Sequence, residues 1–150
     1  MKIKIIYTSV TGNTQETVEV LSDALTAQDI DVAVFDSEDG VEVEDFFTAA
    51  DAYVLATFTD GDGEVPDGIL DFYDDIAEFD LTDIPVAVLG TGDTSYDDFC
   101  QAVDLLAGQC TTSGAHLAVP TLKIELAPDD EAVAAIEQFA QQLTQQVAAE

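Results

Sequence analysis

The stretch that decides the fold of this chain is Tyr7-Thr8-Ser9-Val10-Thr11-Gly12-Asn13-Thr14, which follows the apolar run at residues 3–6 and precedes a helical pattern. Its last seven residues include four hydroxyls, one amide side chain and one glycine, and none of them is charged. Such a loop at a helix N-terminus can present backbone N–H groups and hydroxyls to a phosphate, with about half a positive charge added by the helix dipole. The alternative is an ordinary helix start in which Thr11 or Asn13 is the N-cap residue.

Apolar, β-branched segments alternate with segments of helical period along the whole chain. The predicted strands are residues 2–7, 31–35, 52–57, 85–91 and 116–126, and the predicted helices are 14–28, 42–49, 66–79, 97–113 and 129–148. The pattern predicts one α/β domain over residues 1–150, with a doubly wound parallel sheet of five strands in the order 2-1-3-4-5 and helices on both faces. The apolar runs at 32–35, 53–56 and 86–89 are typical of strands covered on both faces, and Pro120 places the last strand at an edge.

The strand order brings the loops after strands 1, 3 and 4 together at the carboxyl edge of the sheet. The third-strand loop contains the aromatic residue Phe58, and the fourth-strand loop contains Gly90, Gly92 and Tyr96. Two aromatic rings facing a hydroxyl-rich loop form a slot for a planar ring with a phosphate tail, unless Phe58 folds back onto the core. The alternating acids that begin at Asp60 resemble half of a calcium loop, but no glycine stands at the sixth position, so we expect no metal there.

The chain has an extreme charge of −29, with 32 acidic residues against 3 lysines. Nucleic acid and anionic membrane surfaces are therefore poor partners, because almost no cation is available to offset the repulsion. Basic protein surfaces are the favoured partners. Adaptation to high salt would explain the same composition, and the sequence leaves both explanations open.

Cys100 and Cys110 are the only cysteines. If they share one helix they lie roughly 15 Å apart, which is too far for a disulfide, so we expect a reducing compartment. The apolar run near the N-terminus is too short for a signal sequence or a membrane span. We therefore expect a cytoplasmic monomer.

The chain resembles the flavodoxin family of electron carriers over its whole length, through residues 8–14, 57–66 and 90–100. It resembles the short-chain group, because residues 116–126 leave no room for the long-chain insertion. The resemblance implies one-electron transfer by non-covalently bound flavin mononucleotide (FMN), between reductases and acceptor enzymes, with no catalytic residue and no metal. It also implies that Phe58 and Tyr96 lie on opposite faces of the flavin ring. The implied phosphate site is Ser9, Val10, Thr11, Gly12, Asn13 and Thr14, and the implied lining of the ring and ribityl chain is Thr57, Thr59, Asp60, Gly61, Thr91, Gly92, Asp93, Phe99 and Cys100.

Two residues depart from common family patterns. Phe58 stands where tryptophan is frequent, and Thr59 stands where some members have a glycine whose peptide turns over on reduction. A β-branched residue resists positive φ, so we expect the one-electron-reduced flavin to be less stabilised here. Acids of the two loops (Asp60, Asp62, Asp93 and Asp97) should lower the potential of the second reduction by repulsion.

Several other functions remain as alternatives. A flavin-dependent reductase of the same fold would need substrate-binding insertions, and the sequence does not exclude an accessory protein dedicated to one enzyme. A signalling receiver domain would need clustered acids at the end of the first strand, but that strand ends in Tyr7-Thr8-Ser9, and Lys123, the only candidate lysine, has no acid pocket to pair with. A low-molecular-weight phosphatase would need a cysteine in the first loop, which has none. His116 receives no functional role.

Overall fold

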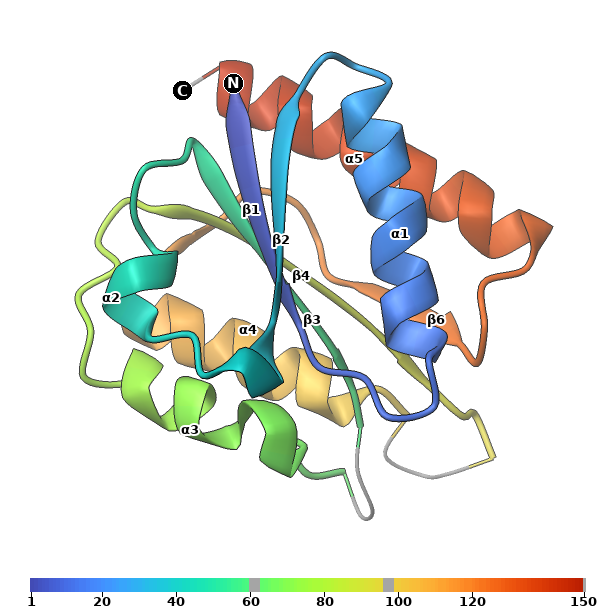
Figure 1. Ribbon diagram of the computed structural model, residues 1–150, viewed down its shortest axis with the longest axis horizontal. Helices are drawn as coiled ribbons and strands as arrows, with labels where there is room; N and C mark the ends of the chain where they lie inside the picture. The colour runs from blue at the N-terminus through green and yellow to red at the C-terminus, as the bar shows by residue number, and fades with distance from the viewer. Residues whose placement is uncertain (60–62, 96–98, 150) are drawn as a thin grey trace.

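The centre of the molecule is a parallel sheet in the order β2-β1-β3-β4-β5 (Figure 1). The computed structural model describes residues 1–59, 63–95 and 99–149. The first four strands are β1 (Lys2–Tyr7), β2 (Asp31–Asp36), β3 (Ala52–Phe58) and β4 (Pro85–Gly92), and every pairing among them is parallel. The predicted strand order and fold class are confirmed.

The fifth strand differs from its prediction, because it is divided into β5 (His116–Leu117) and β6 (Leu122–Glu125). Each segment pairs independently with β4, through Pro85↔His116 and Leu89↔Leu122 among others. Pro120 lies in the gap between the segments. It has no N–H to donate to a ladder, so the apolar run at 116–126 could not continue as one strand.

Helices cover both faces of the sheet (Figure 1). One face carries α1 (Asn13–Thr26) and α5 (Asp130–Ala148), and the other carries α2 (Val43–Phe46), α3 (Asp67–Ile76) and α4 (Gln101–Thr112). A short 3₁₀ helix, η1 (Ser37–Asp39), follows β2. Pro66 is the N-cap residue of α3 and does not lie in its first turn. None of the described helices is long and apolar enough to cross a membrane.

The two faces of the sheet bury different side chains. The α1/α5 face is mainly aliphatic, with Ile3, Ile5 and Leu21 fully buried. The opposite face holds edge-to-face aromatic contacts around Phe46, whose ring lies 5.5 Å from that of Tyr53 and 5.6 Å from that of Phe72. Both cores join the central strands, so the carboxyl ends of β1, β3 and β4 are held by packing from two sides.

Strand β2 corrects one sequence-based expectation. The run at 32–35 was expected to be covered on both faces, yet Val34 is 45% exposed. The reason is its place in the sheet, since β2 pairs only with β1 and the helices beside it leave part of the edge uncovered. The expectation holds for β3 and β4, where residues 52–57 and 86–91 are buried.

Lys4 is a buried lysine, with 7% of its surface exposed. Its ammonium group donates to the backbone oxygens of Asp45 and Phe46, each at 3.2 Å, and lies 5.7 Å from the centre of the Phe35 ring. Burial lowers the pKa of this group. These bonds tie the C-terminal end of α2 to β1.

Candidate functional site

The loops after β1, β3 and β4 begin at one edge of the sheet (Figure 1). The register shows why, because Tyr7 pairs with Ala56 and Phe58 pairs with Thr91. The N–H of Thr8 continues this pairing by donating to Ala56 O at 3.1 Å. The predicted convergence of the three loops is therefore confirmed.

The loop after β1 leaves the N-terminus of α1 open. The N-cap residue is Gly12, with φ 98°, so the alternative of an ordinary helix start capped by Thr11 or Asn13 is wrong. Only glycine adopts this left-handed conformation readily. The Ser9 hydroxyl accepts hydrogen bonds from the N–H groups of Gly12 at 3.2 Å and Gln15 at 3.3 Å.

The first intrahelical donor of α1 is Glu16, whose N–H donates to Gly12 O at 2.9 Å. The N–H groups of Asn13 and Thr14 precede it and have no partner inside the helix. Among the described residues no side chain of the cap position covers them, because Gly12 has none. A Cβ built on Gly12 would meet nothing within 4 Å, so the space beside the cap is free.

A buried hydroxyl pair connects this loop to β4. The hydroxyls of Thr14 and Thr91 lie 2.8 Å apart, and the two residues are 1% and 2% exposed. The two oxygens carry two hydrogens and use one of them between themselves. The second hydrogen of the pair remains for another acceptor.

The loop after β3 starts with Phe58, which is half-buried. Its ring is not among the described side chains that pack into either core, so it does not fold back onto the core. The Thr57 hydroxyl donates to Phe58 O at 2.6 Å, and the Thr59 hydroxyl accepts from the N–H of Ala102 at 3.0 Å. Asp60 and Gly61 lie outside the described residues.

The glycines at the end of β4 are required by close packing within the protein. A Cβ on Gly90 would lie 2.3 Å from Thr57 O and 2.4 Å from Val103 Cγ2. A Cβ on Gly92 would lie 2.9 Å from Cys100 Sγ. The absence of a Cβ at Gly90 therefore lets β3 and α4 pack closely against β4. At Gly92 it lets Phe99 and Cys100 lie close to this edge of the sheet.

The loop after β4 is held by polar side chains. Asp93 accepts bonds from the hydroxyl of Ser95 at 2.7 Å and its N–H at 2.9 Å, and these bonds lower the pKa of Asp93. The hydroxyl of Thr94 donates to the carboxylate of Glu125 on β6. Tyr96 lies outside the described residues, so its position opposite Phe58 stays a prediction.

Cys100 is fully buried and adopts φ 54° as the N-cap residue of α4. Burial raises the pKa of its thiol to about 11. The thiol is therefore neutral near pH 7 and fills space beside Gly92. The predicted helix at 97–113 begins only at Gln101 among the described residues.

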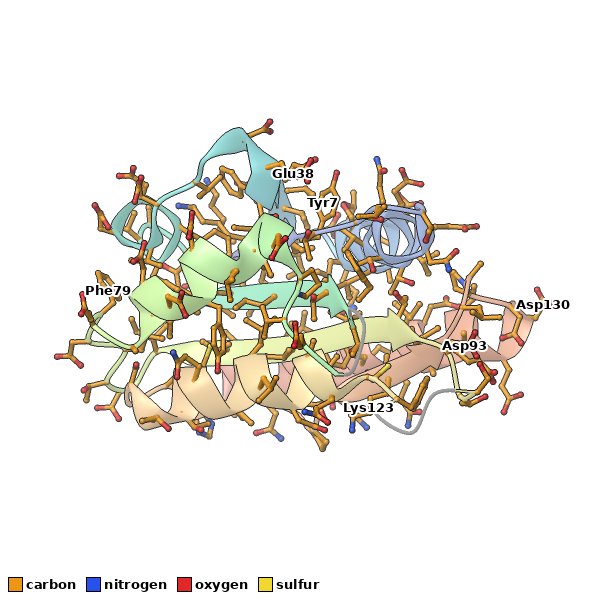
Figure 2. All side chains as sticks on the ribbon, turned by 90° about the horizontal axis from the view of Figure 1, so that it is seen from below. Tyr7, Glu38, Phe79, Asp93, Lys123 and Asp130 are labelled. Carbon is orange, nitrogen blue, oxygen red and sulfur yellow. The ribbon has the colours of Figure 1, made fainter. Side chains whose placement is uncertain are left out.

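Two residues of this edge were missed by sequence reasoning. A Cβ on Gly68 would lie 2.7 Å from the Thr8 hydroxyl and 3.3 Å from a carboxylate oxygen of Glu38. The loop after β2, expected to one side, therefore comes close to Thr8 through Glu38, and Figure 2 shows Glu38 well apart from Asp93. A glycine in the first turn of a helix, against helix propensity, was the available signal.

Comparison with known proteins assigns the family. Residues 5–139 match the family model described as Flavodoxin. The chain is 35% identical over 130 residues to probable flavodoxin 2 of Bacillus subtilis (strain 168), covering 87% of this chain and 85% of that protein.

Solved structures agree with this assignment. Oxidised flavodoxin 2 from Bacillus cereus superposes with a TM-score of 0.92 at 39% identity, over 97% of this chain and 99% of that one. Oxidised flavodoxin 1 from Bacillus cereus gives a TM-score of 0.92 at 33% identity, over 97% and 98%. With the family model matching most of its length and relatives above 30% identity, this chain belongs to the flavodoxin family.

Proposed function

We propose that this protein is a one-electron carrier that binds FMN non-covalently at the carboxyl edge of the sheet. The family supports a flavin, and the open N-terminus of α1 supports one with a phosphate. The observation that carries the proposal is the Gly12 cap, which leaves the Asn13 and Thr14 N–H groups without helical partners next to a loop of hydroxyls.

The phosphate would be held by neutral donors. The residues proposed for this are Ser9, Val10, Thr11, Gly12, Asn13 and Thr14. Thr11 is exposed at the loop surface, and the hydroxyl pair of Thr14 and Thr91 has a hydrogen to offer. The loop has no lysine or arginine, so hydrogen bonds and the helix dipole supply the binding energy.

The ring would lie beside Phe58, whose half-buried position at the end of β3 leaves its face free of both cores. Tyr96 is proposed for the other face. The residues proposed to line the ring and ribityl chain are Thr57, Thr59, Asp60, Gly61, Thr91, Gly92, Asp93, Phe99 and Cys100.

The redox chemistry belongs to the flavin when it is bound, and this chain positions it and adjusts its potential. Asp93 is ionised at neutral pH, as aspartates ordinarily are, and hydrogen bonds from Ser95 lower its pKa further. Its negative charge disfavours additional negative charge nearby and so lowers the potential of the second reduction. No described residue is needed as an acid, a base or a nucleophile.

The partners would be redox proteins with basic docking surfaces. The charge of −29 supports this, because opposite charge accelerates encounter and fixes orientation. Cys100 and Cys110 are buried free thiols, which agrees with a reducing cytoplasm. A protein of this charge repels its own copies, which supports a monomer.

The visible spectrum of the purified protein tests the proposal. We expect flavin absorption bands, about one FMN per chain released by acid, and far weaker binding of riboflavin, which has no phosphate. A colourless protein that rejects added FMN would overturn the proposal. Oxidation of NAD(P)H by the purified protein alone would favour the reductase alternative.

A further inference from the structure

The outer edge of β2 has no neighbouring strand in the described sheet. Strand β2 ends the strand order and pairs with β1 alone, and in the view of Figure 1 it lies between α1 and α2. The N–H of Asp31 donates to Met1 O on the β1 side at 3.0 Å. Peptide groups alternate in direction along a strand, so those of Val32 and Val34 are directed away from β1. They are available to a further strand.

A groove lies along this edge, between β2 and α1. It has a volume of about 240 Å³, and Tyr7, Val18 and Val34 form its apolar part. Val34 is 45% exposed, which makes it one of four large exposed hydrophobic side chains among the described residues. An exposed β-branched side chain beside unpaired backbone groups is what an added strand covers.

The charges around the groove are all negative. Glu19 and Asp23 of α1 line it, and Asp31 and Asp36 stand at the two ends of β2. Asp36, Asp39 and Glu19 all raise the pKa of Tyr7, after the larger effect of burial, so these carboxylates are electrostatically close to its ring. None of the chain's three lysines lines the groove. Lys2 lies at the start of β1, opposite Asp31, Lys4 is buried toward α2, and Lys123 pairs with Asp104 at 2.8 Å.

We infer that the β2 edge and the β2/α1 groove bind an extended, lysine- or arginine-bearing segment of another protein, which adds to the sheet as a strand. The apolar side chains of that segment would cover Val34. Its cations would lie against Glu19 and Asp23 and over the face of Tyr7. The groove shares no residue with the proposed flavin site, although Tyr7 and Gln15 at its end adjoin the proposed phosphate loop.

The charge also decides against a second copy of this chain as the occupant. Two β2 edges brought together would place Asp31 and Asp36 of each copy against acids of the other, in molecules that each carry −29. The same acids that bar self-pairing attract a basic strand. The charge of the β2 edge thus selects a basic segment over a second copy of this chain, and the backbone groups of β2 form the hydrogen bonds with that segment.

The test uses the full flavin-loaded chain, labelled with ¹⁵N, and a synthetic peptide that alternates lysine and valine. At low ionic strength, we expect chemical-shift changes and slower hydrogen exchange at residues 32–36, and shifts in α1 around Glu19. A peptide of the same charge, N-methylated at alternate amides, should bind at least about tenfold more weakly, because it cannot pair with the edge.

A matched pair of variants completes the test. Val34→Lys should weaken the peptide at least about tenfold, because a cation on the edge repels it. Ala134→Lys adds the same charge at an exposed position of α5 and should leave the affinity within about twofold. Equal binding of the N-methylated peptide, or shifts confined to the carboxyl edge, would overturn the inference. Dimerisation of the free protein that Val34→Lys abolishes would also overturn it, by making the occupant a second copy.

Discussion

The loop after β1 and the loops after β3 and β4 share one edge of the sheet but differ in charge. Residues 8–14 contain no ionisable side chain, whereas the other two loops contain Asp60, Asp62, Glu64, Asp93 and Asp97. Helix geometry explains the first, because the N-terminus of α1 offers N–H donors without needing a cation. The carboxylates of the other two loops would lower the potential of a flavin bound as proposed. Under the proposed function, binding of the cofactor and adjustment of its potential would therefore depend on different loops.

The two regions are also held in place differently. The loop after β1 is held by a local hydrogen bond from the N–H of Gly12 to the Ser9 hydroxyl and by the buried hydroxyl pair of Thr14 and Thr91, which connects it to β4. The loop after β4 is held at the surface by the hydrogen bond that the Thr94 hydroxyl donates to the carboxylate of Glu125 on β6. Substitutions that remove the bonds of the loop after β1 should therefore change the affinity for FMN, and substitutions in the loop after β4 should change the flavin potentials.

The largest expected effect comes from a residue on which both regions depend. Gly90→Ala would place a Cβ 2.3 Å from Thr57 O and 2.4 Å from Val103 Cγ2, and backbone cannot move away cheaply. We expect a loss of about 3 kcal/mol in the free energy of unfolding, measured by urea denaturation. Gly108→Ala, with nothing within 4 Å of its added Cβ, should stabilise by about 0.5–1 kcal/mol. Equal stability of the two variants would contradict the close packing of β3, β4 and α4.

The second prediction concerns affinity alone. Thr14→Val removes the hydroxyl that bonds Thr91, and we expect the Kd for FMN to rise about tenfold, measured by fluorescence titration. Thr144→Val removes a comparable bond, to Gln28 Oε1 at 2.8 Å, between α5 and the end of α1. That variant should lose about 1 kcal/mol of stability with an unchanged Kd. A similar rise in both Kd values would show that Thr14 acts through general stability.

The third prediction distinguishes a neutral phosphate loop from a cationic one. Raising the salt concentration from about 0.02 to about 0.5 M shortens the Debye length from about 20 Å to about 4 Å. Repulsion between the −29 chain and the phosphate dianion then decreases, so FMN should bind several-fold more tightly, and riboflavin should change little. The measurement is a pair of titrations at each salt concentration. Weaker FMN binding at high salt would indicate a positively charged clamp.

The fourth prediction sharpens the role of the loop after β3. Thr59→Gly removes the β-branch and also the hydroxyl that accepts from the N–H of Ala102. We expect the two one-electron potentials of the bound flavin to separate by tens of millivolts, where about 1.4 kcal/mol corresponds to about 59 mV. Thr59→Ser keeps the hydroxyl, so it reports the β-branch without the loss of the hydrogen bond. If Thr59→Gly has the same two potentials as the unmodified protein, then the resistance of Thr59 to positive φ does not affect the one-electron-reduced flavin.

The smallest effect is expected for one surface charge of the loop after β4. Asp93→Asn keeps the oxygen that accepts from Ser95 and removes the charge, so the potential of the second reduction should rise by about 10–40 mV. Because the pKa of Asp93 is lowered, its charge and this difference should persist as the pH falls from 8 to about 4, where an ordinary aspartate is already partly protonated. Asp83→Asn, at the opposite edge of the sheet, is the control. A difference that decreases at or above the ordinary pKa of aspartate would contradict the hydrogen-bonded carboxylate.

The strand order and the meeting of three loops could be predicted because they depend on the order of elements along the chain. Alternating strands and helices allow few topologies, and the carboxyl edge follows from parallel pairing. The break at Pro120 was missed because the apolar residues continue on both sides of it. The exposure of Val34 was missed because the apolar run at 32–35 is typical of a strand covered on both faces, although the predicted strand order already placed this strand at an edge.

The details of the site depend on contacts that sequence spacing does not reveal. The pairing of Thr14 with Thr91 joins residues 77 positions apart, and the approach of Glu38 to Gly68 joins loops that are not consecutive. The N-cap residue could not be predicted because Thr11, Gly12 and Asn13 are all suitable caps by type. Which of them adopts positive φ is decided by the path of the loop from Ser9.

The divided fifth strand has a consequence for protein engineering. Because β5 and β6 each pair with β4 on their own, the exposed chain at Pro120 and Thr121 carries no ladder bonds between them. A peptide tag or sensor domain inserted there would cost mainly loop-closure entropy, about 0.6 kcal/mol for each doubling of length. On one side of the insertion, Leu126 would still donate to Gly92 O, and on the other, Ala118 to Val86 O. The edge thus offers a position for reporters that leaves both ends of β4 in place.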